Sequence, residues 1–88
     1  MPEVHFAQAL QTHVPCQAQR VAATTVRAAL DAAFAAAPRL RAYVLDEHGA
    51  LRHHVAVFVD GKALADRTLA TPVAEHSRIH VIQALSGG

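Results

Sequence analysis

The 88-residue chain has few of the residues that mark several common classes of protein. Its one cysteine, Cys16, cannot form an internal disulfide or a cysteine metal cage, so we expect a reducing, cytoplasmic location. The net charge is +1 with neutral histidines, which gives no sign of a nucleic-acid-binding surface. No apolar run approaches the roughly 20 residues of a membrane span, and no signal peptide is indicated. We therefore expect neither nucleic acid nor membrane as a partner.

What the chain does contain is enough apolar sequence for one small domain. Hydrophobic residues make up 52% and charged residues 17%, which argues against disorder. A chain of this length folds as one domain that buries roughly 60–65% of its unfolded surface. Of the four glycines, the last two are Gly87 and Gly88. We expect a single domain over residues 1–88 with a flexible tail at 85–88.

The first part of the chain is predicted to form a hairpin and then a helix. Alternation predicts one strand over residues 3–10 and a second over residues 16–22, with Ala18 and Val21 as its apolar members. Thr24 or Thr25 can cap the helix that follows, and Pro38 ends it. Its apolar stripe consists of Val26, Ala29, Leu30, Ala33, Phe34 and Ala37.

Three further strands are predicted in the second half. The first covers residues 41–45 and is closed by a turn at 46–49. The second, residues 51–59, precedes a tight Asp60-Gly61 turn and has two faces. Val55, Val57 and Val59 share one face, and Ala56 and Phe58 share the other. A long connection over residues 62–77, with Leu64, Leu69 and Val73 as anchors, leads to the last strand, residues 79–85, with Ile79 and Val81 inward.

The order strand, strand, helix, strand, strand, loop, strand fits an α+β fold in which a mixed sheet of four to five strands packs on one main helix. This is the β-grasp, or ubiquitin-like, arrangement. In it the last strand lies at the centre of the sheet beside the first, and it projects the tail into solvent.

The tail has the properties of a segment that enters a narrow channel. The residues after Ala84 span at most about 13–14 Å, and Gly87 and Gly88 have no side chains to obstruct entry. The terminal carboxylate is a poor acyl donor. A partner enzyme could convert it with ATP to an acyl-adenylate, from which sulfur or a thiol could displace AMP.

These features resemble the ThiS/MoaD family of ubiquitin-like sulfur carriers over essentially the whole chain. The resemblance is carried by V-H-F at 4–6, T-V-R-A-A-L at 25–30, V-A-V-F-V-D-G at 55–61 and I-H-V-I-Q-A-L-S-G-G at 79–88. Residues 49–88 are most similar to a CysO-like branch. Glu75-His76-Ser77 and Asp60 depart from the family's usual turn residues.

The resemblance implies a carrier that is not itself an enzyme. A ubiquitin-activating-type enzyme would adenylate Gly88, and a sulfurtransferase or sulfide would convert it to a thiocarboxylate. A biosynthetic enzyme making cysteine or a related metabolite would accept the sulfur. Leu85, Ser86 and Gly87 would thread the partner's channel, and ATP and magnesium would belong to the partner, with no cofactor bound by this chain.

Other functions remain open at this point. The chain could be the small subunit of molybdopterin synthase, a modifier joined through Gly88 to lysines of target proteins, or an interaction module whose terminal glycines are inert.

Phe58, Ile82 and Ala84 are predicted to form a partner-docking surface beside the tail. They point away from the helix-covered side of the sheet, and exposed apolar patches often mark partner surfaces. Cover by the 62–77 connection and dimerisation are the alternatives for this surface.

The remaining candidate residues give weaker signals. Seven histidines include adjacent His53 and His54, expected on opposite sides of a strand, and His5 and His80, expected to be neighbours. No metal site is predicted, because supporting ligands at suitable spacing are missing. Cys16 and Lys62 are expected to be bystanders. Arg39, Arg41 and Arg52 form either a weakly positive partner patch or a solvated edge.

Overall fold

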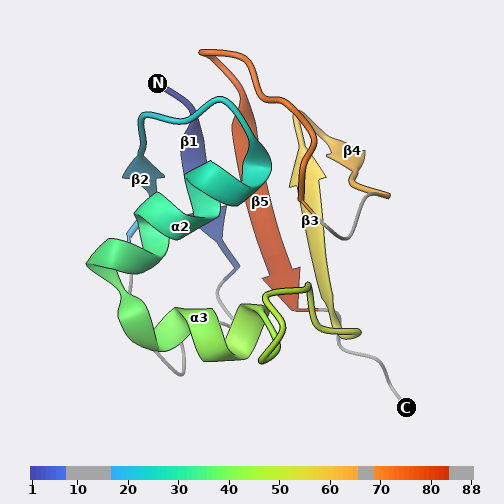
Figure 1. The fold of residues 1–88 in the computed structure, drawn as a ribbon. Coiled ribbons are helices and arrows are strands. Elements are labelled where there is room, and N and C mark those ends of the chain that lie inside the picture. The colour runs from blue at the N-terminus through green and yellow to red at the C-terminus, as the bar shows by residue number, and fades with distance from the viewer. Residues whose placement is uncertain (8–16, 66–68, 84–88) are drawn as a thin grey trace.

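The computed structural model describes residues 1–7, 17–65 and 69–83, in which helices cover one face of a sheet (Figure 1). The five strands are β1 (Glu3–Phe6), β2 (Gln19–Arg20), β3 (Val55–Val59), β4 (Lys62–Ala63) and β5 (Arg78–Gln83). Their order across the sheet is β2-β1-β5-β3-β4. Because β5 pairs in parallel with β1 and antiparallel with β3, the last strand is central, and the predicted β-grasp fold is confirmed.

Helix α2 (Val26–Ala36) agrees closely with its prediction. Thr25 is the N-cap, and its Oγ1 accepts a hydrogen bond of 3.2 Å from the amide of Ala28. All six residues of the predicted apolar stripe are buried. The helix ends before Pro38, since a residue that precedes proline disfavours helical angles.

The predicted strand at residues 41–45 is wrong: this segment belongs to a second helix, α3 (Pro38–Val44). Pro38 ends α2 but also occupies the first turn of α3, where its fixed φ suits a helix and its missing N–H costs nothing. Leu40 and Val44 are spaced four residues apart and are fully buried. One face of α3 therefore completes the core, and only Leu45 keeps an isolated bridge, to Leu51.

The strand predicted over residues 51–59 begins only at Val55. His53 and His54 lie in a turn that precedes it, so the prediction that they occupy opposite sides of a strand is wrong. The amide of Val55 bonds to the carbonyl oxygen of Arg52 across this turn, at 3.1 Å. The local turn bond thus competes with extension of the strand toward Leu51.

The core lies between α2, α3 and the inner face of the sheet. Alternation along the strands buries one residue in two, as the sequence predicts. These inward residues are Val4 and Phe6 of β1, Val55 and Val57 of β3, and Ile79 and Val81 of β5. The rings of Phe6 and Phe34 approach to 6.3 Å between centroids, which joins β1 to α2.

The described part of the 62–77 connection is tied to the start of α2. The amides of Val26 and Arg27 donate to the carbonyl oxygens of Thr71 and Leu69, at 3.0 and 2.9 Å. Leu69 is fully buried, and Leu64 and Val73 pack partly buried against the core, so the three predicted anchors are confirmed. Within the described part of this connection, the prediction missed β4, which opens it. No helix within the described ranges is long and apolar enough to cross a membrane.

Candidate functional site

The site predicted from the sequence begins where β5 ends. Gln83, the last residue of β5, pairs with Val55 at the start of β3. The segment that follows it directly in sequence carries the predicted tail residues. Ala84, Leu85, Ser86, Gly87 and Gly88 lie outside the described residues. What the structure does define is the strand that precedes them and the surface around it.

Phe58 and Ile82 lie on the outer face of the sheet, which is the face opposite α2 and α3. Ile82 pairs with Ala56, and Phe58 pairs with His80 on one side and with Ala63 on the other. The apolar patch formed by Ala56, Phe58 and Ile82 is half-buried, because neighbouring strands shield part of each side chain. The structure therefore brings the two described docking candidates to one face, near the end of β5, and their docking role stays a prediction.

The middle of the outer face carries the two histidines expected to be neighbours. His5 and His80 occupy paired positions on β1 and β5, and their rings stack with centroids 4.8 Å apart and planes inclined by 14°. Nε2 of His5 lies 3.0 Å from Oε1 of Glu3. His80 is also the direct partner of Phe58, so the stacked pair borders the apolar patch.

Charged residues occupy the far end of the same face, at the start of β5. Glu3 on β1 lies between Arg20 on β2 and Arg78 on β5, at directly paired positions. Its Oε2 is 3.6 Å from Nε of Arg20. The hydrogen bond with His5, supported by the charges of Arg20 and Arg78 and opposed by partial burial, lowers the pKa of Glu3 below its ordinary value of 4.5.

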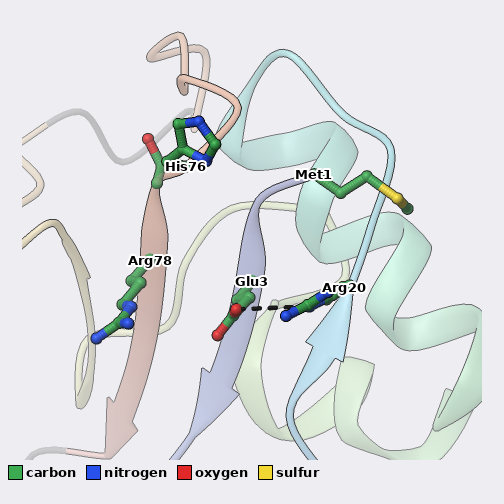
Figure 2. Close-up of a pocket in the computed structure, with 6 residues that line it drawn as sticks. Met1, Glu3, Arg20, His76 and Arg78 are labelled. Carbon is green, nitrogen blue, oxygen red and sulfur yellow. Dashed lines mark ion pairs between the residues drawn. The ribbon is translucent and has the colours of Figure 1, made fainter.

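A cavity of about 490 Å³ opens at this charged end (Figure 2). Its lining consists of Met1, Glu3, Arg20, His76, Ser77 and Arg78. No sequence motif indicates this cavity. The alternation of inward and outward residues along β1 and β5 could have placed Glu3 and Arg78 on the outer face. The position of Arg20 opposite Glu3 could not be predicted in this way, because it depends on the register in which β1 pairs with β2.

The other arginine candidates lie near α3 among acidic groups. Nη1 of Arg41 is 3.2 Å from Oδ1 of Asp31, and Nε of Arg52 donates to the carbonyl oxygen of Ala42 at 2.8 Å. Both arginines line a second cavity, of about 380 Å³, together with Asp46 and Glu47. The mixed charge of this cavity favours a solvated edge over a positive partner patch.

Asp46 shapes the turn beside that second cavity. Its Oδ1 accepts hydrogen bonds from the amides of Ala50 and His48, at 3.0 and 2.8 Å. These bonds lower the pKa of the Asp46 carboxyl below its ordinary value of 3.8, and the bond from Ala50 has the largest effect. The carboxylate therefore has a structural role, which confirms the predicted turn at 46–49.

The remaining candidates concern metal ligation and reactive side chains. Within residues 1–7, 17–65 and 69–83, no group of three or more histidine, cysteine, aspartate or glutamate side chains could hold a metal ion. Cys16 lies outside these ranges. Lys62 is exposed on the edge strand β4.

Comparison with known proteins identifies solved structures that share the fold of this chain. No protein-family model and no curated protein sequence matches it. Among solved structures, small archaeal modifier protein 1 of Haloferax volcanii shares 29% identity, with a TM-score of 0.84 over 99% of this chain and 98% of that chain. A chain of the BexX/CysO complex of Amycolatopsis orientalis has the same TM-score at 19% identity, with 100% of both chains covered.

A third similar structure is CysO of Mycobacterium tuberculosis. It shares 18% identity, with a TM-score of 0.81 over 97% of this chain and 100% of that chain. At these identities the CysO structures establish the fold, whereas the archaeal modifier is also the more similar in sequence. The family resemblance predicted from the sequence is confirmed by these neighbours.

Proposed function

We propose that this chain, a β-grasp protein that resembles the ThiS/MoaD sulfur carriers, is itself a sulfur-carrier protein. In this proposal a partner enzyme adenylates the carboxylate of Gly88, and the product is converted to a thiocarboxylate. The thiocarboxylate then donates its sulfur to the biosynthesis of cysteine or a related sulfur metabolite. The chain acts as a cosubstrate, and ATP and magnesium are bound by the partner.

The observation that carries the proposal is the position of β5. It is the central strand, hydrogen-bonded on both sides, and the sequence A-L-S-G-G follows its last residue directly. A segment that follows a central strand starts from a fixed point of the fold. The two glycines at its end allow close approach of a partner's backbone, because they lack side chains and adopt unusual backbone angles.

With sulfide as the sulfur donor, the chemistry proposed for the tail balances without a redox step. An oxygen of the Gly88 carboxylate attacks the α-phosphorus of ATP, and pyrophosphate leaves. Sulfide then attacks the acyl carbon, and AMP leaves with the bonding electron pair. If the persulfide of a sulfurtransferase attacks instead, the product is an acyl disulfide, and a thiol reductant must supply two electrons to cleave its S–S bond and release the thiocarboxylate. In this proposal the partner supplies the cation and the donors that stabilise these charges.

Mass spectrometry of the intact protein isolated from its native host tests the proposal. A thiocarboxylate adds about 16 Da, the difference between sulfur and oxygen. The same measurement on a variant that lacks Gly88 is the control, because that variant should show no such species. Full activity of the Gly88-deletion variant in the host would overturn the proposal.

Protein modification is a second candidate function, and one observation favours it. The structure with 29% identity is that of a small archaeal modifier protein. If this chain were joined through Gly88 to lysines of target proteins, denaturing gels would show high-mass ladders containing it. These ladders would disappear on deletion of Gly88, whereas a pure sulfur carrier would give the thiocarboxylate without ladders.

A further inference from the structure

We propose that the cavity at the start of β5 binds an acidic segment of a partner protein, with a carboxylate of that segment paired to Arg78. This inference is independent of the chemistry of the tail. It rests on the charges, contacts and position of the cavity shown in Figure 2.

The lining of the cavity carries more positive than negative charge. Two guanidinium groups, those of Arg20 and Arg78, accompany the single carboxylate of Glu3. His76, also in the lining, is exposed and adds either no charge or a positive one. A carboxylate that enters the cavity therefore meets a surplus of cationic groups.

Glu3 does not cancel this surplus, because its carboxylate is already engaged within the protein. Oε1 is 3.0 Å from His5 and Oε2 is 3.6 Å from Arg20. Figure 2 shows Arg20 directed toward Glu3, whereas the side chain of Arg78 extends away from it. The repulsion that Glu3 exerts on an incoming anion is thus reduced by the two groups that contact it.

Arg78 is the second arginine of the lining, and its guanidinium is available to an incoming carboxylate. Its guanidinium makes no ion pair with any side chain in the described part of the chain, although its backbone amide donates to Oδ1 of Asp60 at 2.9 Å. An arginine offers five donors in a planar fork that matches a carboxylate in two parallel hydrogen bonds. Arg20 would be a weaker second contact for the ligand, because it already pairs with the carboxylate of Glu3 and its side chain is 76% exposed.

The shape of the cavity favours a peptide over a free inorganic anion. A volume of about 490 Å³ holds several side chains and is larger than a phosphate ion requires. Met1, which is 57% exposed, gives one wall an apolar surface. A side-chain carboxylate flanked by apolar residues of the same peptide fits this combination of a cationic group and an apolar wall.

The cavity lies at the end of β5 opposite to Gln83, the residue that precedes the tail segment in sequence. Arg78 and Gln83 are the two ends of β5, and at about 3.3 Å per residue they lie roughly 17 Å apart. The apolar patch of Ala56, Phe58 and Ile82 occupies the same face between and beside them. A partner that covers this face would therefore contact the cavity without obstructing the end of β5.

The test is a titration of the isotope-labelled full-length chain with a blocked peptide of alternating glutamate and leucine, followed by NMR. We expect shifts concentrated at Glu3, Arg20, Ser77 and Arg78, and weaker binding at high salt. Arg78→Gln should weaken the affinity by up to about fivefold, the upper end of what an exposed ion pair contributes. Arg20→Gln should weaken it less, and the amide spectrum of each variant checks its fold.

Arg39→Gln is the matched control, because it removes the same charge from an exposed position on α3. It should change the affinity less than twofold. Equal effects of Arg39→Gln and Arg78→Gln, or shifts spread over the whole surface, would overturn the proposal. So would inorganic phosphate, if it gave the same shifts at the same concentration with the same dependence on Arg78. This titration measures peptide binding and does not depend on whether Gly88 becomes a thiocarboxylate. Its failure would therefore leave the proposed function untouched, and failure of the proposed function would leave this inference untouched.

Discussion

At the scale of single residues, the turn between β3 and β4 shows how two backbone angles set the edge of the sheet. Asp60 and Gly61 have φ values of 52° and 83°, the left-handed region that a two-residue hairpin turn requires at both positions. Oδ1 of Asp60 also accepts a hydrogen bond from the backbone amide of Arg78, at 2.9 Å. The aspartate therefore connects the turn to the start of β5, and an asparagine could accept the same bond.

Gly61→Ala should lower the free energy of unfolding by about 1–2 kcal/mol, the cost of left-handed backbone angles for a residue with a Cβ atom. Steric contact does not contribute, because a Cβ built on Gly61 meets nothing within 4 Å. Urea denaturation measures the change. Lys62→Ala, at the next exposed position, is the control and should have little effect. Equal stability of Gly61→Ala and the native chain would show that the turn adapts without cost.

The carboxylate of Glu3 gives the stability a pH dependence. Its pKa is lowered in the folded protein, chiefly by the bond with His5, so its ionised form stabilises the fold at pH values above the ordinary value of 4.5. This contribution is lost as the pH falls below that value toward the folded-state pKa. Glu3→Gln should therefore flatten the dependence of stability on pH in the acid range, as measured by urea denaturation at a series of pH values.

Two further variants separate this effect from a general change in charge. His5→Asn removes the imidazole and should reduce the pH dependence in part. Glu47→Gln removes one carboxylate from an exposed turn and controls for net charge. If Glu3→Gln and Glu47→Gln gave the same curves, the network around Glu3 would not stabilise its ionised form.

At the scale of elements, the start of α2 is held by a side chain and by the connection after β4. The first amides of a helix have no partner within it. Here Val26 and Arg27 donate to the carbonyl oxygens of Thr71 and Leu69, and Ala28 donates to Oγ1 of Thr25. Leu69 takes a φ of 66° to present its carbonyl and is fully buried. The connection thus fixes the helix to the sheet.

Thr25→Ala should lower the free energy of unfolding by about 1 kcal/mol, because the amide of Ala28 loses its acceptor. Thr24→Ala is the control from the same sequence context. The backbone carbonyl oxygen of Thr24 accepts a hydrogen bond from the amide of Val73, and this bond does not involve the side chain of Thr24. Thermal or urea denaturation of both variants decides between them. A larger loss with Thr24→Ala would mean that the cap is misassigned.

The two helices also show what sequence patterns can and cannot predict. The stripe of α2 repeats over three turns, so periodicity and the threonine cap were sufficient to place it. Helix α3 has seven residues, too few for a clear period, and Arg41–Leu45 looks like a short strand when it is read alone. Its helical state depends on burial of Leu40 and Val44 against the core. Only tertiary packing supplies that information.

At the scale of the whole molecule, the order of elements predicted the topology, including the central position of β5. Alternation along β3 and β5 also placed Phe58 and Ile82 on one face. The charged cavity could not be predicted in the same way, because Arg20, Glu3 and Arg78 come from three strands. Their meeting depends on two registers. That Arg78 makes no ion pair with a described side chain depends on the direction in which its own side chain extends.

The face that carries both surfaces leads to the last prediction. If a partner adenylates the tail while covering the outer face, an acidic group in the apolar patch should impair its docking. Phe58→Asp and Ile82→Asp should each lower kcat/KM for the partner's ATP–pyrophosphate exchange by about tenfold or more, mainly through KM, as expected at the centre of an interface.

Ala35→Asp introduces the same charge at an exposed position of α2, on the other layer, and should leave the rate nearly unchanged. Thermal denaturation of all three variants verifies that each remains folded under the assay conditions. Equal rates for Phe58→Asp, Ile82→Asp and Ala35→Asp would place the docking surface elsewhere, since a partner that contacts only the tail would not distinguish the two layers of the fold.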